Sequence, residues 1–185
     1  MKLLTRLVSR VALKGRPEPT SPTAVYVPQA VARETARFIS SYGTGRERHE
    51  GIAYWAGVAT GSAWVITTVL APEAVTTAGS YKTTAPDNAQ VVGEVNRLRL
   101  QILAQIHGHP GDWVDHSLGD DEGAFMPYEG FYSLVLPRYG CQGMLPLSKC
   151  GVHRYQGCRF VRLTSEEIEE RFVIVPTSAD LRRRR

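Results

Sequence analysis

Hydrophobic positions along this chain follow two periods, and the change from one period to the other predicts the secondary structure. β-Branched and aromatic runs with alternating polarity indicate strands, whereas an apolar repeat of three to four residues indicates helices. The predicted elements in chain order are strand 24–28, helix 29–41, strands 51–59 and 63–70, a helix from Pro86, strand 102–109, a helix from Ser117, strands 131–137 and 158–164, helix 164–170 and strand 172–176. Residues 71–84 and 138–157 are predicted to be connections. This order predicts a mixed α+β fold with a largely antiparallel sheet flanked by helices.

The length of 185 residues predicts one domain with a separate segment at each end. A basic leader and a proline-rich linker occupy residues 1–21, the predicted domain spans 22–176, and a basic tail covers 177–185. No apolar run approaches the ~18 to 20 residues of a membrane helix, so no membrane span is predicted. Three cysteines without a Cys-x-x-Cys pair predict reduced thiols and a cytoplasmic protein.

The positive charge of the chain belongs to its ends. Five lysines or arginines lie in residues 1–16 and four arginines at 182–185, which leaves 13 basic and 18 acidic residues elsewhere. The body therefore has a net charge of −5, although the whole chain has a formal net charge of +4. Basic ends are able to contact nucleic acid or anionic lipid, but solvated ends are the commoner explanation. The charge distribution thus argues against a nucleic-acid partner.

Two histidines, a serine and an aspartate stand at intervals that suit a metal site. His107 and His109 are two apart at the end of an apolar run, so on a strand both side chains point to the same face. Pro110-Gly111 predicts a turn, and Ser117 and Asp120 are three apart, which puts both on one face of a helix. Two imidazole nitrogens and a carboxylate oxygen leave a fourth tetrahedral position open, as in catalytic zinc sites. The spacing predicts one Zn²⁺ per chain, bound by His107, His109 and Asp120.

Each half of this motif also has a purely structural explanation. A serine followed three residues later by an acid is close to a helix-capping box, and neutral histidines often lie half-buried at strand ends. The two halves occurring together at this spacing favour the metal site. Among the other histidines, His116 is predicted to lie at the surface or behind the ligands and to point away from the metal. His49 and His153 have no partner spacing and are predicted to have no role.

The pattern of His-x-His, seven residues, Ser, two residues and Asp resembles that of the JAMM metalloproteases, also called JAB or MPN+ proteins. That family has an upstream glutamate at the start of a strand, and the matching segment here is Glu50-Gly-Ile-Ala-Tyr-Trp-Ala-Gly57. Ala53 replaces a glycine of the family pattern, Trp55 replaces an aliphatic residue, and Gly108 stands where serine or threonine is more usual. The residues around the histidines are similar to bacterial JAB proteins encoded beside ubiquitin-like activating and conjugating enzymes. The resemblance implies a JAB/MPN-like, cytidine-deaminase-like fold.

The resemblance also assigns roles to individual residues. Glu50 would be the general base that acts on an activated water, and the hydroxyl of Ser117 would stabilise the developing oxyanion. Glu47 is a weaker candidate for the base, because it lies in a polar segment whereas Glu50 directly precedes the apolar strand. Trp113, on the predicted turn between the ligands, is a candidate for contact with the substrate.

The substrate expected from the resemblance is a ubiquitin-like protein. JAMM enzymes cleave isopeptide or peptide bonds after the C-terminal glycine of such proteins, so the chain is expected to be a zinc-dependent isopeptidase. Its expected partners are a ubiquitin-like protein or its conjugates, and the associated activating and conjugating enzymes. Residues 71–84 and 121–130 are expected to flank the channel for the glycine-containing tail. Three alternatives stay open: processing of a sulfur-carrier-like protein, a non-catalytic MPN scaffold, and the DNA-repair-associated branch, whose His-Asn-His-Pro-Ser-Gly motif this chain lacks.

Overall fold

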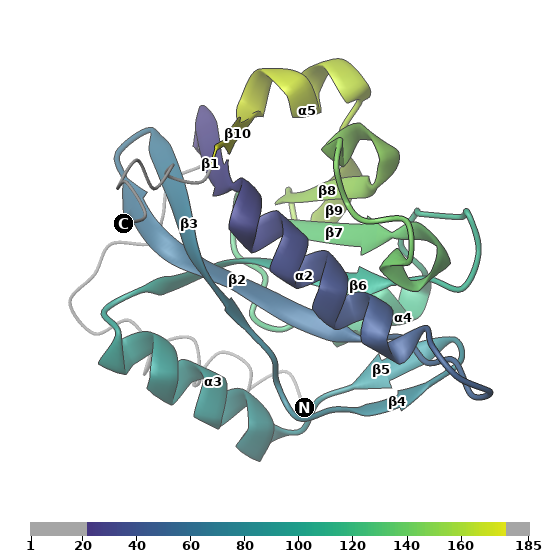
Figure 1. Ribbon diagram of the computed structural model, residues 1–185. Helices are drawn as coiled ribbons and strands as arrows, with labels where there is room; N and C mark the ends of the chain where they lie inside the picture. Colours follow the sequence, from purple (N-terminus) through teal and green to yellow (C-terminus); the bar gives the residue numbers. More distant parts are fainter. Residues whose placement is uncertain (1–21, 177–185) are drawn as a thin grey trace, which may run out of the picture.

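The computed structural model describes residues 22–176, which form an eight-stranded sheet, a small two-stranded sheet and four α-helices (Figure 1). The strands of the large sheet are β1 (Ala24–Pro28), β2 (Ile52–Thr60), β3 (Ala63–Leu70), β6 (Gln101–Gly108), β7 (Tyr132–Leu136), β8 (Gly151–Gln156), β9 (Arg159–Arg162) and β10 (Phe172–Val175). The helices are α2 (Gln29–Tyr42), α3 (Ala85–Arg97), α4 (Leu118–Gly123) and α5 (Ser165–Arg171), with short 3-10 segments η1 (Pro137–Gly140) and η2 (Leu147–Lys149).

The large sheet has the strand order β10-β1-β3-β2-β6-β7-β8-β9. Of its seven pairings within residues 22–176, four are antiparallel and three are parallel, namely β1 with β10, β1 with β3 and β6 with β7. The predicted mixed α+β fold with a largely antiparallel sheet is therefore confirmed. Within the same residues, no helix is both long enough and apolar enough to cross a membrane.

Helix α2 crosses one face of the large sheet, as Figure 1 shows. Its apolar positions recur every three or four residues, and Val31, Ala36 and Ile39 are buried in the principal core. Thr35 lies on the same buried stripe, and its hydroxyl accepts a hydrogen bond of 2.7 Å from the indole N–H of Trp55 on β2. This bond satisfies a buried polar group and fixes α2 over the strands whose ends carry the candidate site.

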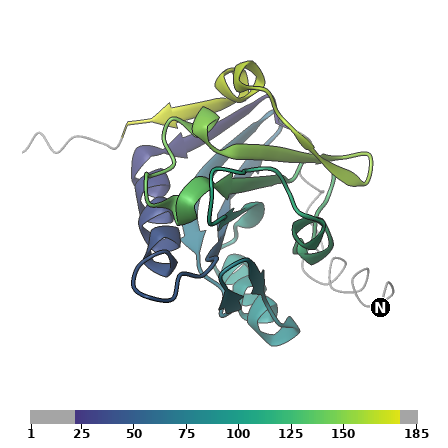
Figure 2. The same cartoon turned by 90° about the vertical axis from the view of Figure 1, so that its right-hand side faces the viewer.

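Strand β2 is buried on both faces, so its alternate side chains enter two separate cores. Trp55 joins the principal core beneath α2, whereas Tyr54 packs in a second core with Val91 and Val95 of α3. In the view of Figure 2, α2 lies along the left edge of the strands and α3 lies below them. Trp55 and Trp64, which the sequence predicts to be core residues, are both fully buried. The central strands are thus held from both sides.

Two segments predicted to be connections contain strands. Residues 71–84 include a hairpin of β4 (Val75–Thr77) and β5 (Ser80–Lys82), whose strands are too short to show an alternating pattern. Residues 138–157 include β8, where the polar residues His153 and Arg154 interrupt any apolar run. These two predictions were wrong because pairing with a neighbouring strand, and not local periodicity, keeps the segments extended. The predicted leader and tail lie outside the described residues, so the domain boundaries stay a prediction.

Candidate metal centre

The histidine pair lies at the end of β6, one of the central strands of the large sheet. All eight residues of β6 are buried, because β2 pairs along one edge and β7 along the other. His107 stands opposite Ile52 of β2, and the backbone N–H of His109, directly after the strand, donates to the carbonyl of Leu136 at 2.9 Å. The backbone of both histidines is therefore fixed by the sheet, as a preorganised site requires.

The packing of the sheet explains the glycine between the two histidines. A Cβ atom at Gly108 would lie 2.9 Å from Cγ2 of Ile39 on α2 and 3.1 Å from Cα of Tyr139 on η1. A larger side chain would therefore force α2 or η1 to shift. Because Gly108 faces away from the histidines, its departure from the more usual serine or threonine leaves the site unchanged.

Asp120 reaches the histidines from the first turn of α4. Ser117 is the N-cap of this helix, and the two residues form a capping box. The Asp120 N–H donates to Ser117 Oγ at 3.2 Å, and the Ser117 N–H donates to Asp120 Oδ2 at 2.7 Å. The cap uses Asp120 Oδ2, so Oδ1 stays available to a metal. The spacing of Ser117 and Asp120 therefore serves both as a helix cap and as part of a candidate metal site.

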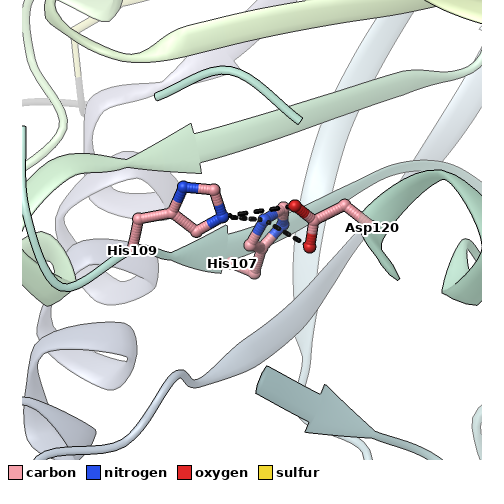
Figure 3. A group of neighbouring side chains, drawn as sticks. All are labelled: His107, His109 and Asp120. Atoms are coloured by element: carbon pink, nitrogen blue, oxygen red, sulfur yellow. Dashed lines mark hydrogen bonds and ion pairs between the residues drawn. The ribbon is translucent and has the colours of Figure 1, made fainter. Parts of the chain in front are cut away.

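The Nε2 atoms of His107 and His109 converge with the carboxylate of Asp120 (Figure 3). His107 Nε2 lies 3.2 Å from His109 Nε2 and 3.2 Å from Asp120 Oδ1, and His109 Nε2 lies 3.3 Å from Asp120 Oδ2. Ligand atoms at the corners of a tetrahedral zinc site, each about 2.0–2.1 Å from the ion, stand about 3.3 Å from one another. Both separations from His107 Nε2 match this spacing, and one ligand atom from each of the three residues lies within 4.8 Å of the other two, so the group suits a small cation.

Trp113 fixes the orientation of His109. Its carbonyl oxygen lies 3.1 Å from His109 Nδ1, which assigns the hydrogen to Nδ1 and leaves the lone pair on Nε2 for a metal. The indole also stacks on the imidazole, with ring centroids 5.0 Å apart and 12° between the ring planes. Trp113 is 54% exposed, so apolar surface lies beside the ligands. Its contact with a substrate stays a prediction.

The electrostatics of the three side chains suit a divalent metal. Burial acts to raise the pKa of Asp120, but hydrogen bonds with His107 and His109 outweigh it and hold that pKa well below its usual range. Burial lowers the pKa of His107, which favours the neutral imidazole that a metal needs. Burial acts in the same direction on His109, yet the hydrogen bond with Asp120 raises the pKa of His109 overall. Protons therefore compete with a metal for this group as the pH falls.

Glu50 lies inside the site, directly before β2. Glu50 stands two residues before Ile52, which pairs with His107 across β2 and β6. Glu50 is only 4% exposed, whereas the side chain of Glu47 is 90% exposed. Burial raises the pKa of Glu50 to about 7, with His109 acting to lower it and Asp120 to raise it. A carboxyl group that titrates near neutral pH suits a general base, so the geometry favours Glu50 over Glu47.

The hydroxyl of Ser117 is already engaged. It donates to Asp120 Oδ2 at 2.8 Å and so helps to orient the carboxylate. To donate to an oxyanion, as the sequence predicts, Ser117 would have to break this hydrogen bond. Its role as an oxyanion stabiliser stays a prediction.

A second layer of polar groups lies behind the three side chains, and no local spacing in the sequence reveals it. Asp121 Oδ1 lies 2.7 Å from one ring nitrogen of His116, and Ser133 Oγ lies 2.8 Å from the other. The ring of buried His153 lies 4.1 Å from that of His116, centroid to centroid. Because the side chain of His116 is buried, the surface position predicted for it was wrong, and the alternative behind the ligands holds. Tyr81 of β5 is a further group missed by the sequence, since its hairpin was not predicted.

The fold and the site together define a mixed α+β domain with a buried His-His-Asp group of metal-binding geometry. No family model matches the chain. It is similar to the probable metalloprotease y4jG of Sinorhizobium fredii, with 35% identity over 104 residues, covering 51% of this chain and 60% of that protein. The chain thus spans about three fifths of the relative that it matches.

One solved structure of low sequence identity shares the arrangement of elements, and a second is more distant. Protein DSY2949 from Desulfitobacterium hafniense is 12% identical with a TM-score of 0.62, covering 83% of this chain and 94% of that one. AF2198, a JAB1/MPN domain protein from Archaeoglobus fulgidus, is 12% identical with a TM-score of 0.40, covering 78% of this chain and 98% of that one. The first likeness concerns the fold alone, and a TM-score as low as the second does not establish a common fold. The ligand motif resembles that of the JAMM/MPN metalloproteases, and the chain is similar in sequence to a probable metalloprotease.

Proposed function

We propose that this protein is a zinc-dependent peptidase that hydrolyses the amide bond after the C-terminal glycine of a ubiquitin-like protein. The observation that carries the proposal is the convergence of His107, His109 and Asp120, whose ligand atoms lie within 4.8 Å of one another, next to a buried glutamate. His107, His109 and Asp120 would hold the ion. Three protein ligands leave one tetrahedral position open, which is the mark of a catalytic zinc site, because structural sites use four protein ligands.

The chemistry divides between the metal and Glu50. Zinc in such a site lowers the pKa of water to about 7 and polarises a carbonyl group. Glu50 accepts a proton from water while the water oxygen bonds to the carbonyl carbon, and it delivers that proton to the amine nitrogen as the carbon–nitrogen bond breaks. With a pKa of about 7, Glu50 is able to do both near neutral pH. The products are a carboxylate and an amine, and no bond forms between protein and substrate.

The substrate class is proposed from the family resemblance and from the burial of the site. His107, His109, Asp120 and Glu50 are all buried, so the substrate backbone that reaches them must be thin. Glycine residues have no side chain to obstruct such an approach. The exposed indole of Trp113 would contact the rest of the tail.

The proposed partners follow from the same substrate class. They are a ubiquitin-like protein or its conjugates, together with the activating and conjugating enzymes that act on it. The three cysteines, all free, fit the cytoplasm as the place of action.

The proposal is tested with purified protein and a panel of fusions in which a ubiquitin-like or sulfur-carrier-like protein is joined through its terminal glycine to a reporter. We expect about one zinc per chain, and cleavage that stops with a chelator and returns when zinc is added back. Cleavage is expected to be lost in Glu50→Gln and retained in Glu47→Gln, a matched variant of the exposed neighbour. Cleavage that survives Glu50→Gln contradicts the assigned base. Zinc binding without cleavage of any fusion favours a scaffold, and cleavage of sulfur-carrier fusions alone favours that alternative.

A further inference from the structure

The hydroxyl of Tyr81 is buried at the candidate site and has no hydrogen-bond partner among residues 22–176. Tyr81 lies on β5, and its ring packs against the imidazole of His107 with ring centroids 5.1 Å apart. Buried hydroxyls are almost always paired with protein, water or a ligand, so an unpaired one beside candidate metal ligands points to a partner that arrives with the reaction.

Hydrogen bonds connect the hairpin that carries Tyr81 to the candidate site. The backbone N–H of Glu50 donates to the carbonyl of Thr77 at 2.8 Å, and the hydroxyl of Tyr139 donates to the carbonyl of Ala78 at 2.8 Å. Glu50 and the hairpin therefore hold each other in place. Tyr81 is positioned by the same contacts that position the proposed base.

The Tyr81 hydroxyl is available as a donor. A tyrosine hydroxyl has an ordinary pKa of about 10, so it keeps its proton throughout the neutral range. The hydroxyl of Ser117, in contrast, already donates to Asp120. Tyr81 can donate without first breaking a hydrogen bond.

We propose that the Tyr81 hydroxyl donates a hydrogen bond to the carbonyl oxygen of the scissile amide as that oxygen gains negative charge. The inference rests on the proposed peptidase function, and it adds a catalytic donor that lies outside the His-x-His and Ser-x-x-Asp motif. A fixed donor aimed at developing charge in a dry site lowers the barrier more than it strengthens substrate binding. The hydroxyl should therefore act on kcat and leave KM unchanged.

The test uses Tyr81→Phe, which removes the hydroxyl and keeps the ring against His107. On a fusion that the wild type cleaves, we expect kcat to fall about 100-fold while KM and zinc content stay the same. The thermal midpoint is expected to stay or to rise, because the lost hydroxyl had no partner. The matched control is Tyr132→Phe, which removes another buried tyrosine hydroxyl, in the principal core and near Arg171. This control is expected to keep the wild-type kcat.

Binding supplies a second measurement that does not depend on turnover. The probe is a Gly-Gly phosphinic dipeptide, in which a tetrahedral, negatively charged phosphinate replaces the amide, and its affinity for the zinc-loaded protein is measured by calorimetry. We expect Tyr81→Phe to bind it about 100-fold more weakly and Tyr132→Phe to bind it like the wild type. Unchanged kcat or unchanged affinity in Tyr81→Phe overturns the donor role, and a loss of zinc would make Tyr81 a metal-binding group instead. A wild type that neither cleaves a fusion nor binds the probe refutes the peptidase proposal itself.

Discussion

Two pairs of buried histidines lie next to each other in this protein, and only one of them has the geometry of a metal site. The ring centroids of His107 and His109 are 4.9 Å apart, and those of His116 and His153 are closer still, at 4.1 Å. The two pairs are neighbours, since the rings of His107 and His116 are 6.0 Å apart. Closeness of imidazoles is therefore not what makes a metal site.

The direction of the ring nitrogens makes the difference. In the first pair both Nε2 atoms face the carboxylate of Asp120 within 3.3 Å. In the second pair, Asp121 and Ser133 occupy both nitrogens of His116, and Asp115 lies 3.7 Å from His153 Nε2. Burial lowers the pKa of His153 to about 3, so this ring stays neutral when folded. The second pair packs the interior behind the site, whereas the first pair aims its lone pairs at one point.

The largest expected difference between the pairs is in metal content. His109→Leu should abolish stoichiometric zinc binding, lowering the affinity by more than about 100-fold, because a first ligand matters more than the outer contacts that are worth 10–100-fold. His153→Leu, of similar volume, should still bind about one zinc per chain, since the convergent His-His-Asp group does not include His153. Elemental analysis after dialysis against zinc measures both. Full zinc content in His109→Leu would remove it from the ligand set.

The next difference concerns the acid that each pair faces. Only the first pair lies beside a carboxyl group whose pKa is raised to about 7, that of Glu50. A general base works only when deprotonated, so hydrolysis should fall about tenfold per pH unit below that pKa. A bound cation would lower the pKa of Glu50, which puts the midpoint at about 7 or below it. Steady-state rates across pH, with zinc content measured at each pH, test this; a rate that is flat from pH ~7 to ~5 with zinc retained would exclude Glu50 as the base.

The first pair could be predicted from the sequence because its geometry is local. His107 and His109 share a strand end, and Asp120 follows after one turn and a helix cap, so spacing alone brings them together. Glu50 could be found because it precedes an apolar strand, and the family pattern names it. The motif thus carried both the candidate ligands and the candidate base.

The second pair and Tyr81 depend on contacts that spacing does not encode. His116 meets His153 only because β8 pairs with β7, and β8 was predicted to be a connection. Tyr81 reaches the site on a hairpin whose three-residue strands show no period. Long elements, such as α2 with its one buried face and β2 with its continuous apolar run, could be placed from the sequence, whereas short paired segments could not.

The second pair should also affect how the free energy of unfolding depends on pH, through His153. The pKa of His153 is about 3 in the folded protein, against an ordinary value of about 6.5. Between these values the unfolded chain binds a proton that the folded chain does not, so stability falls as the pH falls below about 6.5. One such group contributes a slope of about 1.4 kcal/mol per pH unit. Denaturant unfolding of the metal-free protein should show this slope, and it should be shallower in His153→Leu. An identical slope in that variant would mean that His153 takes up its proton while folded.

The smallest expected effect separates capping from metal binding at Ser117. Three helices begin with the same capping box, formed by Thr84 with Asp87, by Ser117 with Asp120 and by Thr164 with Glu167. Replacing the capping hydroxyl by alanine should cost about 1 kcal/mol of stability at each of them. Only Ser117→Ala should also weaken zinc binding, by about 10-fold, because only its hydroxyl orients a carboxylate that faces the histidines.

The matched variant for this last comparison is Thr164→Ala, which removes the same kind of cap from α5, a helix that carries none of the three candidate ligands. Thermal unfolding and zinc titration of the two variants separate the two roles of Ser117. Equal stability loss with unequal zinc affinity is expected. Unchanged zinc affinity in Ser117→Ala would mean that the backbone N–H of Ser117, at 2.7 Å from Asp120 Oδ2, is enough to hold the carboxylate in place. A fall in kcat beyond about 100-fold at saturating zinc would instead return the oxyanion role to Ser117, since a single such donor is worth at least that much.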